Sequence, residues 1–243
     1  EWAEHKDYER KHAKLKWPWF NCKDSTIFQI KDLAKPLPYD AASLLRKKFS
    51  ASNVRRATLY ICGLGYFEAF INHTRVGNDV LNPAWTNFNH RSFYCTYDVT
   101  SLIANGDNAI GVMLGRGQYN PLTNDIWKLS QSAWVDQPKL IALLRIVRAD
   151  GSVTNIVTDD SWKVAPGPIV YDDTRQGEIY DARQKHDGWT TATYDDSAWA
   201  NASTVPCDNP LRSQTIPPVR RHGSMKPINI FKRRNNSTIY DLG

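Results

Sequence analysis

The chain has 243 residues, 41% of them hydrophobic and 23% charged, which is the composition of a folded protein and excludes a disordered one. Its formal net charge is +6, but no zinc-finger spacing, RNA-binding signature or basic helix accompanies that charge, so we expect no nucleic acid as a partner. No stretch approaches the roughly 20 consecutive apolar residues of a membrane-spanning helix, so we expect no membrane span.

The N-terminal stretch lacks the period of a regular element. Residues 1–12 are polar and charged, whereas residues 14–20 are aromatic and include a proline, as in an edge strand or a docking segment. We therefore interpret residues 1–43 as a lead-in and docking segment.

From residue 44 onward, short runs of β-branched and aromatic residues recur between turn residues. The turn at Asp150-Gly151 indicates a hairpin, because its residues accept the positive φ angles that a tight turn needs. Short strands at this spacing, without the long helical crossovers of a parallel sheet, predict an all-β fold, an antiparallel β-sandwich. The expected strands cover residues 44–49, 57–62, 66–71, 91–99, 109–114, 140–147 and 153–158.

Gly63 and Gly65 follow an apolar run, which raises the alternative of a nucleotide-binding loop. Such a loop has the pattern G-x-G-x-x-G and opens a helix, but Glu68 stands in the third glycine position and residues 66–71 have the character of a strand. We therefore interpret the glycines as the bend of a β-hairpin, where they permit a bulge or close packing of the backbone.

Two similar phrases, DDSWKV at residues 159–164 and YDDSAW at residues 194–199, place a tryptophan shortly after paired aspartates. Asp and Ser side chains can cap a short turn while the ring packs beneath it, so we interpret both phrases as structural anchors. Between them, residues 167–183 hold the densest run of polar functional groups in the chain. Residues 206–218 are rich in proline, which indicates a linker or an edge segment before a further β-like passage.

The four cysteines include no C-x-x-C pair, so neither a zinc site nor a thioredoxin-like motif is indicated. Cys62 and Cys95 lie in apolar runs and are predicted to be buried thiols. With Cys22 and Cys207 they permit three disulfide pairings, among which the sequence does not choose.

Taken in order, several phrases resemble the N-terminal region of bacterial α-L-rhamnosidases, the inverting glycoside hydrolases of family 78. The resemblance runs from about residue 44 to residue 205, and GEIYDAR at residues 177–183 is its most specific element. The matching phrases are residues 57–103, from ATLYICGLGYF to TYDVTSLI, then GDNAIGVMLGRGQYN at 106–120, GPIVYDDTRQGEIYDAR at 167–183 and GWTTATYDDSAW at 188–199.

The resemblance implies a jelly-roll, galactose-binding-like module over residues 44–205, and a linker with the start of a fibronectin-like β module over residues 206–243. It also implies a longer parent enzyme, whose helical (α/α)6 barrel carries the carboxylate pair for hydrolysis. Neither a long helical stretch nor the clustered acidic motif of such a barrel occurs in this sequence. We therefore expect a non-catalytic region that supports the barrel, with rhamnose-containing glycans as its candidate ligand.

Two alternatives stay open beside this expectation. The chain could be a purely structural module with no ligand, or it could be a self-sufficient enzyme. Members of the family occur in the cytoplasm, in the periplasm and outside the cell, so the compartment is open, with the latter two slightly favoured.

Calcium is the one cofactor that the resemblance adds, because some members bind rhamnose with calcium on this module. Calcium takes oxygen ligands, and oxygen-rich loop positions are present, but the ligands of the family cannot be aligned onto them residue by residue, so the metal site is unknown. These positions are Asn78, Asp79, Asn87, Asn120, Asn124, Asp125 and Asp136.

Sugar recognition pairs an aromatic face with polar side chains that hold the hydroxyls. Trp85 follows Asn82-Pro-Ala in a loop after a strand, where an exposed ring could reach a ligand, and Asn120 is a polar loop residue. Tyr119, Trp127 and Trp134 are further possible platforms.

Glu178, Asp181 and Arg183 complete the candidates for substrate binding or for bracing the barrel. Arg183 could instead pair with Asp181 or Asp172 and close a loop within the module. Glu178 and Asp181 raise the idea of an acid–base pair, but a spacing of three residues does not set the separation that such chemistry needs, so we expect no catalytic residue.

Overall fold

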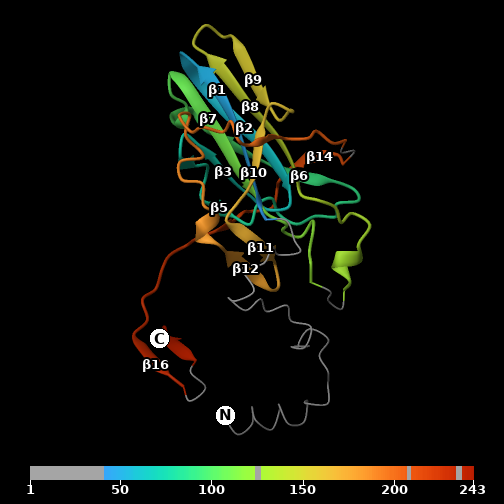
Figure 1. The fold of residues 1–243 in the computed structure, drawn as a ribbon, viewed down its shortest axis with the longest axis vertical. Coiled ribbons are helices and arrows are strands. Elements are labelled where there is room, and N and C mark those ends of the chain that lie inside the picture. The colour runs from blue at the N-terminus through green and yellow to red at the C-terminus, as the bar shows by residue number, and fades with distance from the viewer. Residues whose placement is uncertain (1–40, 124–126, 207–208, 234–236) are drawn as a thin grey trace.

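The computed structural model describes residues 41–123, 127–206, 209–233 and 237–243 (Figure 1). The predicted lead-in, apart from its last three residues, therefore lies outside the described residues, as do Cys22, Cys207, Asn124 and Asp125. Within the described part, no helix has the length and apolar character needed to cross a membrane.

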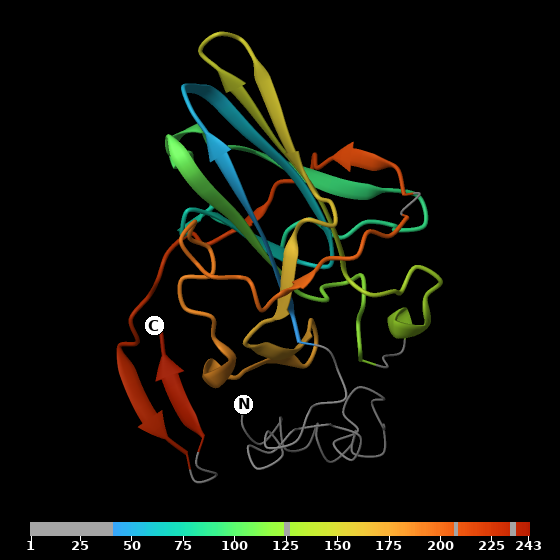
Figure 2. The same ribbon diagram turned by 45° about the horizontal axis from the view of Figure 1, so that its top comes forward.

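Two β-sheets form the body of the protein, and Figures 1 and 2 show them stacked face to face. Every pairing within them is antiparallel except the short parallel pairing of β14 with β6. The first sheet has the order β13 (Ala200–Asn201), β10 (Lys163–Pro166), β1 (Ser43–Ala51), β7 (Gly106–Leu114), β3 (Phe67–Ile71) and β4 (Thr74–Arg75). The second sheet has the order β14 (Leu211–Ser213), β6 (Ser92–Asp98), β2 (Val54–Leu64), β8 (Lys139–Arg148) and β9 (Val153–Val157).

The core lies between the two sheets, because alternate side chains of each strand point inward. Leu59 and Leu144 come from the second sheet, Ile71 and Val112 come from the first, and all four belong to one buried cluster. Each such side chain contributes about 1.5–3 kcal/mol when it is fully buried. The prediction of an all-β antiparallel sandwich is confirmed, and the helical segments in the described residues are single 3₁₀ turns, η3 (Thr100–Leu102), η4 (Leu129–Gln131) and η5 (Ala182–Gln184).

Three two-stranded pairs stand outside the main sheets. Two of them are hairpins, formed by β11 (Ile169–Asp173) with β12 (Gly177–Tyr180) and by β16 (Asn229–Lys232) with β17 (Thr238–Asp241). In the third, β15 (Val219–Arg220) pairs with β5 (Asp79–Val80), and the Arg220 guanidinium lies 2.8 Å from the Asp79 carboxylate. The proline-rich segment is therefore fastened to the sandwich through both β14 and β15.

The two tryptophan phrases fold alike, as predicted. The Asp159 carboxylate accepts a hydrogen bond from the Ser161 amide, and the Asp195 carboxylate accepts one from the Ser197 amide, each at 3.0 Å. The rings that follow, Trp162 and Trp199, are both buried.

A buried arginine fixes the second phrase to the first sheet. Arg46 on β1 is inaccessible to solvent and forms an ion pair with Asp196. Its guanidinium also donates to the carbonyls of Trp189 and Thr191, each at 2.7 Å. The polar loop between residues 186 and 199 thereby covers the outer face of this sheet.

The two described cysteines are buried, as predicted. Cys95 belongs to the core between the sheets, whereas Cys62 belongs to a separate buried cluster with Leu64. Although their strands are neighbours, the two side chains point to opposite faces of the sheet. Burial raises the pKa of Cys95 to about 11, so its thiol stays protonated at neutral pH.

The prediction of a hairpin at Gly63 and Gly65 is wrong, because the two flanking strands belong to different sheets. β2 pairs with β6 and β8, whereas β3 pairs with β4 and β7. The bend therefore carries the chain from one layer of the sandwich to the other. Gly65 has a φ of 121°, and a Cβ there would overlap the carbonyl oxygen of Gly115. Close backbone packing, which the sequence suggested as one role of these glycines, is what the bend requires.

We expect the substitution Gly65→Ala to lower the free energy of unfolding by about 2–4 kcal/mol, from backbone strain and overpacking together. Gly106→Ala is the matched control, because Gly106 has a φ of 98° and a Cβ there would meet nothing within 4 Å. Gly106→Ala should lower the free energy of unfolding by only about 1 kcal/mol, because backbone strain is the only unfavourable effect there. Urea unfolding measures both variants, and equal losses would show that the contact with Gly115 is unimportant.

Candidate functional site

One end of the sandwich gathers most of the predicted site residues. Two loops, residues 81–91 and residues 115–138, meet there beside the β11–β12 hairpin, which Figure 1 shows below the main sheets. We call this region the loop end. Residues 124–126 of the second loop lie outside the described part of the chain.

An aromatic cluster joins the two loops. Phe88 from the first loop makes edge-on contact with Tyr119 from the second, with ring centroids 5.2 Å apart, and lies 6.3 Å from Trp134. Phe88 and Tyr119 are buried against Cys62 and Leu64 of β2. The loops thus share a small core of their own, which fixes their relative position.

The Asp173 carboxylate ties the second loop to the hairpin. It is buried and accepts hydrogen bonds from the amides of Leu122 and Thr123 at 2.8 and 2.9 Å, and from the Thr123 hydroxyl at 2.5 Å. It also accepts from the amides of Arg175 and Gln176 in the β11–β12 turn. Burial opposes the charge, but these donors together hold the pKa of Asp173 below its usual value.

The neighbouring Asp172 points to the other side of β11, as alternation along a strand requires. It accepts a hydrogen bond from the Arg116 amide at 2.6 Å and lies against Gly115, where a Cβ would be 2.8 Å from its carboxylate oxygen. Burial raises the pKa of Asp172. The paired aspartates therefore fasten both the start and the middle of the 115–138 loop.

The loop end presents two large aromatic rings to solvent. Trp85 is 50% exposed and Trp127 is 55% exposed, and each stands on one of the two loops. The Arg175 guanidinium lies 4.6 Å from the centre of the Trp127 ring, while the Ala84 amide donates to the Gln214 side chain at 2.8 Å. Exposed rings on fixed loops suit contact with the apolar face of a sugar.

Asn120 lies in the same loop but is only 8% exposed. The backbone amide of Asn120 donates to the Arg116 carbonyl at 3.2 Å, so the main chain closes a turn here. Of the predicted platforms, Tyr119 and Trp134 serve the aromatic cluster between the loops, which leaves Trp85 and Trp127 as the accessible rings.

The three residues from the GEIYDAR phrase are placed separately. Asp181 accepts two hydrogen bonds from the Arg183 guanidinium, at 2.8 and 2.7 Å, so the structure pairs Arg183 with Asp181 rather than with Asp172. Arg183 is 72% exposed, and water screens the pair. Glu178 stands on β12 opposite Asp172.

These two carboxylates have different surroundings. The hydrogen bonds from Arg183 hold the pKa of Asp181 well below its usual range, so Asp181 is a paired anion at neutral pH. Burial, with Asp172 and Glu68 nearby, raises the pKa of Glu178. No interaction in the structure links Glu178 to Asp181 among the described residues.

Three of the oxygen-rich positions that the sequence offered to calcium have side-chain contacts within the protein. Asp79 pairs with Arg220, Asp136 pairs with Lys139, and Asn87 accepts from the Asn89 amide. The described residues contain no group of three or more acidic, histidine or cysteine side chains able to hold a metal. Asn124 and Asp125 lie outside the described residues, so calcium stays a prediction of the sequence.

Sequence reasoning did not identify Asp173 or Phe88 as important for this region. A signal for Asp173 was present, since an aspartate at the end of a strand before Thr-Arg-Gln is suited to accept from the turn amides that follow. Phe88 carried no comparable signal, because its aromatic partners Tyr119 and Trp134 are more than thirty residues away along the chain.

Comparison with known proteins places most of the chain in one family. Residues 52–223 match the model of the alpha-L-rhamnosidase N-terminal domain. An alpha-L-rhamnosidase of Formosa agariphila is 36% identical over 219 residues, covering 87% of this chain and 23% of that protein. Another, from Streptomyces avermitilis, is 35% identical over 207 residues, covering 84% of this chain and 20% of that protein.

Solved structures give the same result. The alpha-L-rhamnosidase of Dictyoglumus thermophilum aligns with a TM-score of 0.75 and 38% identity, over 83% of this chain and 22% of that one. The Streptomyces avermitilis enzyme, solved in complex with L-rhamnose, aligns with a TM-score of 0.77 and 35% identity. The alignment covers 84% of this chain and 20% of that enzyme. The chain thus spans about a fifth to a quarter of the length of these relatives.

We expect Asp173→Asn to lower the free energy of unfolding by about 2–3 kcal/mol at neutral pH, because an amide cannot accept from all of these donors. The folded pKa of Asp173 lies below the unfolded value, so its stabilisation is present above the unfolded pKa and is lost as the pH falls through the folded pKa. The difference in free energy of unfolding between wild type and Asp173→Asn should therefore become smaller below about pH 4.

Denaturant titrations at several pH values measure this difference. Asp160→Asn is the matched control, since Asp160 is exposed in a turn, and it should change stability by less than about 0.5 kcal/mol at every pH. If the difference in free energy of unfolding between wild type and Asp173→Asn did not change with pH, ionised Asp173 would not be the source of the stabilisation.

Proposed function

Because this chain belongs to the α-L-rhamnosidase N-terminal domain family, we propose that it is a non-catalytic module of a longer α-L-rhamnosidase and that its loop end binds rhamnose-containing glycans. Hydrolysis of terminal α-L-rhamnosides then belongs to the rest of the parent enzyme. The proposal rests on the family match and on the share of each relative that the chain covers.

The placement of the carboxylates supports a non-catalytic role. Inverting hydrolysis needs one acid and one base about 6.5–9.5 Å apart, with a water between them. Asp181 is held as an anion by Arg183, and Asp173 is enclosed by five donors. Both carboxylates therefore have structural partners within the module, which is consistent with a non-catalytic role.

The two exposed tryptophans are the observation that carries glycan binding. Trp85 and Trp127 stand on loops that a shared aromatic cluster and the Asp173 carboxylate hold in place, so binding costs little loop ordering. Neutral side chains nearby, including Gln118 and Thr174, can hydrogen-bond sugar hydroxyls. A relative solved with L-rhamnose is consistent with this ligand class.

Support of the catalytic part is the second element of the proposal. The Asp181–Arg183 pair, in which Arg183 is the exposed member, lies directly after β12 at the 3₁₀ turn η5 beside the loop end. A charged pair on a fixed turn can hydrogen-bond a neighbouring domain at the rim of an interface. A purely structural module without a ligand would still support the catalytic part but would not bind a glycan.

Titration calorimetry with L-rhamnose tests the glycan ligand. We expect measurable heat for the wild-type chain, and a loss of affinity of about tenfold for Trp85→Ala or Trp127→Ala, since stacking contributes about 1–2 kcal/mol. Tyr240→Ala is the matched control because Tyr240 is 62% exposed but lies on the separate β16–β17 hairpin.

The titration is run both with added calcium and with a chelator, so that a metal requirement is detected. Absence of heat under both conditions would leave the purely structural module as the better description. A loss of affinity with Tyr240→Ala equal to that of the tryptophan variants would place binding elsewhere.

A second experiment addresses catalysis. The purified chain should release no chromophore from an aryl α-L-rhamnoside, whereas a full-length relative serves as the positive control. Turnover by the chain alone, abolished by Glu178→Gln and Asp181→Asn, would establish it as a self-sufficient enzyme.

A further inference from the structure

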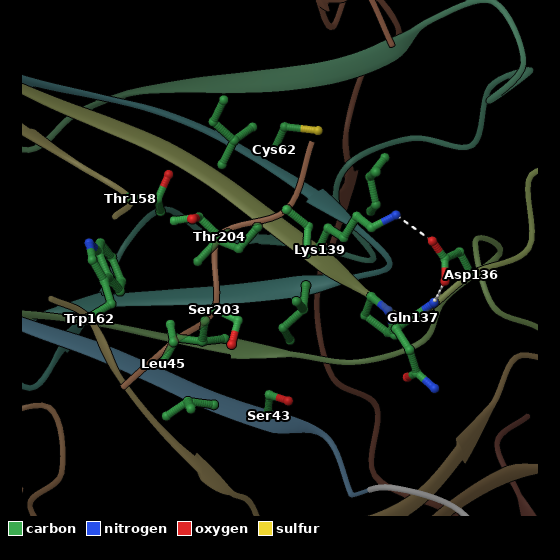
Figure 3. Close-up of a pocket in the computed structure, with 18 of the residues that line it drawn as sticks. Ser43, Leu45, Cys62, Asp136, Gln137, Lys139, Thr158, Trp162, Ser203 and Thr204 are labelled. Carbon is green, nitrogen blue, oxygen red and sulfur yellow. Dashed lines mark hydrogen bonds and ion pairs between the residues drawn. The ribbon is translucent and has the colours of Figure 1, made fainter. Parts of the chain in front are cut away.

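A large cavity lies beside the start of β1, close to the point where the described chain begins. It has a volume of about 850 Å³ and is lined by β1 and β10 of the first sheet and by β2 and β8 of the second. Figure 3 shows Ser203 and Thr204 within it, with Ser43 and Leu45 of β1 nearby. The cavity adjoins the loop end, because residues 136–138 line it as well. We call this cavity the side groove.

Two apolar side chains point into the sandwich at the side groove without being covered. Leu45 lies on the same face of β1 as Phe49, a member of the buried core, since side chains four positions apart along a strand share a face. Val164 stands opposite Leu45 on β10. Phe49 is only 8% exposed, whereas Leu45 and Val164 are half-buried. Protein interiors contain few voids larger than a water molecule, so the described residues leave this end of the interior unfilled.

β8 has an open edge at the side groove. β9 pairs with β8 only from Leu143 onward, so within the described ranges no strand pairs with residues 139–141 on the edge away from β2. On this edge the Ala142 carbonyl accepts from the Thr158 amide at 3.1 Å. Because main-chain groups alternate between the two edges of a strand, the amide and carbonyl of Leu140 point the same way. An open edge of this kind is a template for one more strand.

The sequence before the described residues contains an aromatic segment that suits this edge. Residues 14–20 read KLKWPWF, and the position of Trp17 before Pro18 favours an extended main chain. In an extended segment Leu15, Trp17 and Trp19 share one face. Pro18 lacks an amide proton, which an edge strand tolerates at a residue whose main chain points away from the neighbouring strand. The main chains of Trp17 and Trp19 then point toward that neighbour.

The place where the described chain begins puts this segment within reach of the side groove. The Ala42 amide donates to the Ile169 carbonyl, and the Ala42 carbonyl accepts from the Gly167 amide, each at 2.8 Å. The chain is therefore fixed next to Ser43, which lines the groove. Residues 21–40 span at most about 70 Å, and a tether of this size keeps the local concentration of a segment near the millimolar range.

From these observations we propose that residues 14–20 add to the open edge of β8 as a further strand and place Trp17 and Trp19 in the side groove. A tryptophan buries about 150–250 Å² of surface, so the two rings cover the half-buried Leu45 and Val164 and complete the interior. The tether favours this segment over the same segment of a second copy. The contact is made within one chain and does not depend on a glycan at the loop end.

Amide hydrogen exchange of the whole chain, resolved to single residues, tests the contact. We expect the Leu140 amide to be protected in the wild type. The double substitution Trp17→Ala with Trp19→Ala should speed its exchange by at least about tenfold, because the edge of β8 is then open to water. The Leu144 amide is the internal reference, since Leu144 lies in the part of β8 that β9 covers, and its exchange should not change.

Trp2→Ala is the matched control, because Trp2 precedes the segment and is also a tryptophan outside the described residues. It should leave the exchange of Leu140 as in the wild type. Thr204→Trp tests the contact from the other side, since its ring occupies the groove and should speed exchange of the Trp19 amide by about tenfold. Ser101→Trp, at an exposed position on η3 outside the groove, should not.

Equal exchange of Leu140 in the wild type and in the double variant would overturn the proposal. Equal acceleration by Trp2→Ala, or of Leu144 together with Leu140, would do the same, because the effect would then not be local. Protection of Leu140 that falls on dilution of the wild type would show that a second copy supplies the strand. Thr204→Trp keeps the proposal testable even if the double variant does not fold, since it leaves residues 14–20 unchanged.

Discussion

The geometry of the loop end depends on a single buried carboxylate. Asp173 accepts hydrogen bonds from two segments that lie about fifty residues apart in the chain. One is the turn after β11, and the other is the part of the 115–138 loop at Leu122 and Thr123. A buried charge is tolerated only when such donors surround it, so the contact requires both segments to be in place at once. The part of the loop around Leu122 and Thr123 is thereby fixed against the β11–β12 hairpin.

The sequence predicted the strands well and their connections less well. Alternation and turn residues located the strand pair around Asp150-Gly151 closely, because both signals are local. The bend at Gly65 was misassigned as a hairpin, since the residues that determine which sheet receives the next strand, such as Gly115, lie far away in sequence. The proline-rich segment likewise carries no local sign that β14 and β15 fasten it to the sandwich.

The candidate site was predictable in part for the same reason. The sequence left Trp85 open between an exposed ring in a loop and a core tryptophan, and its ring is 50% exposed in the structure. The pairing of Arg183 with Asp181 was one of two open alternatives, because spacing along a chain does not fix which carboxylate an arginine reaches. The cavity of about 850 Å³ beside residues 202–206 could not be foreseen at all, since segments from most of the chain line it, among them β1, β2, β8 and β10, and they share no motif.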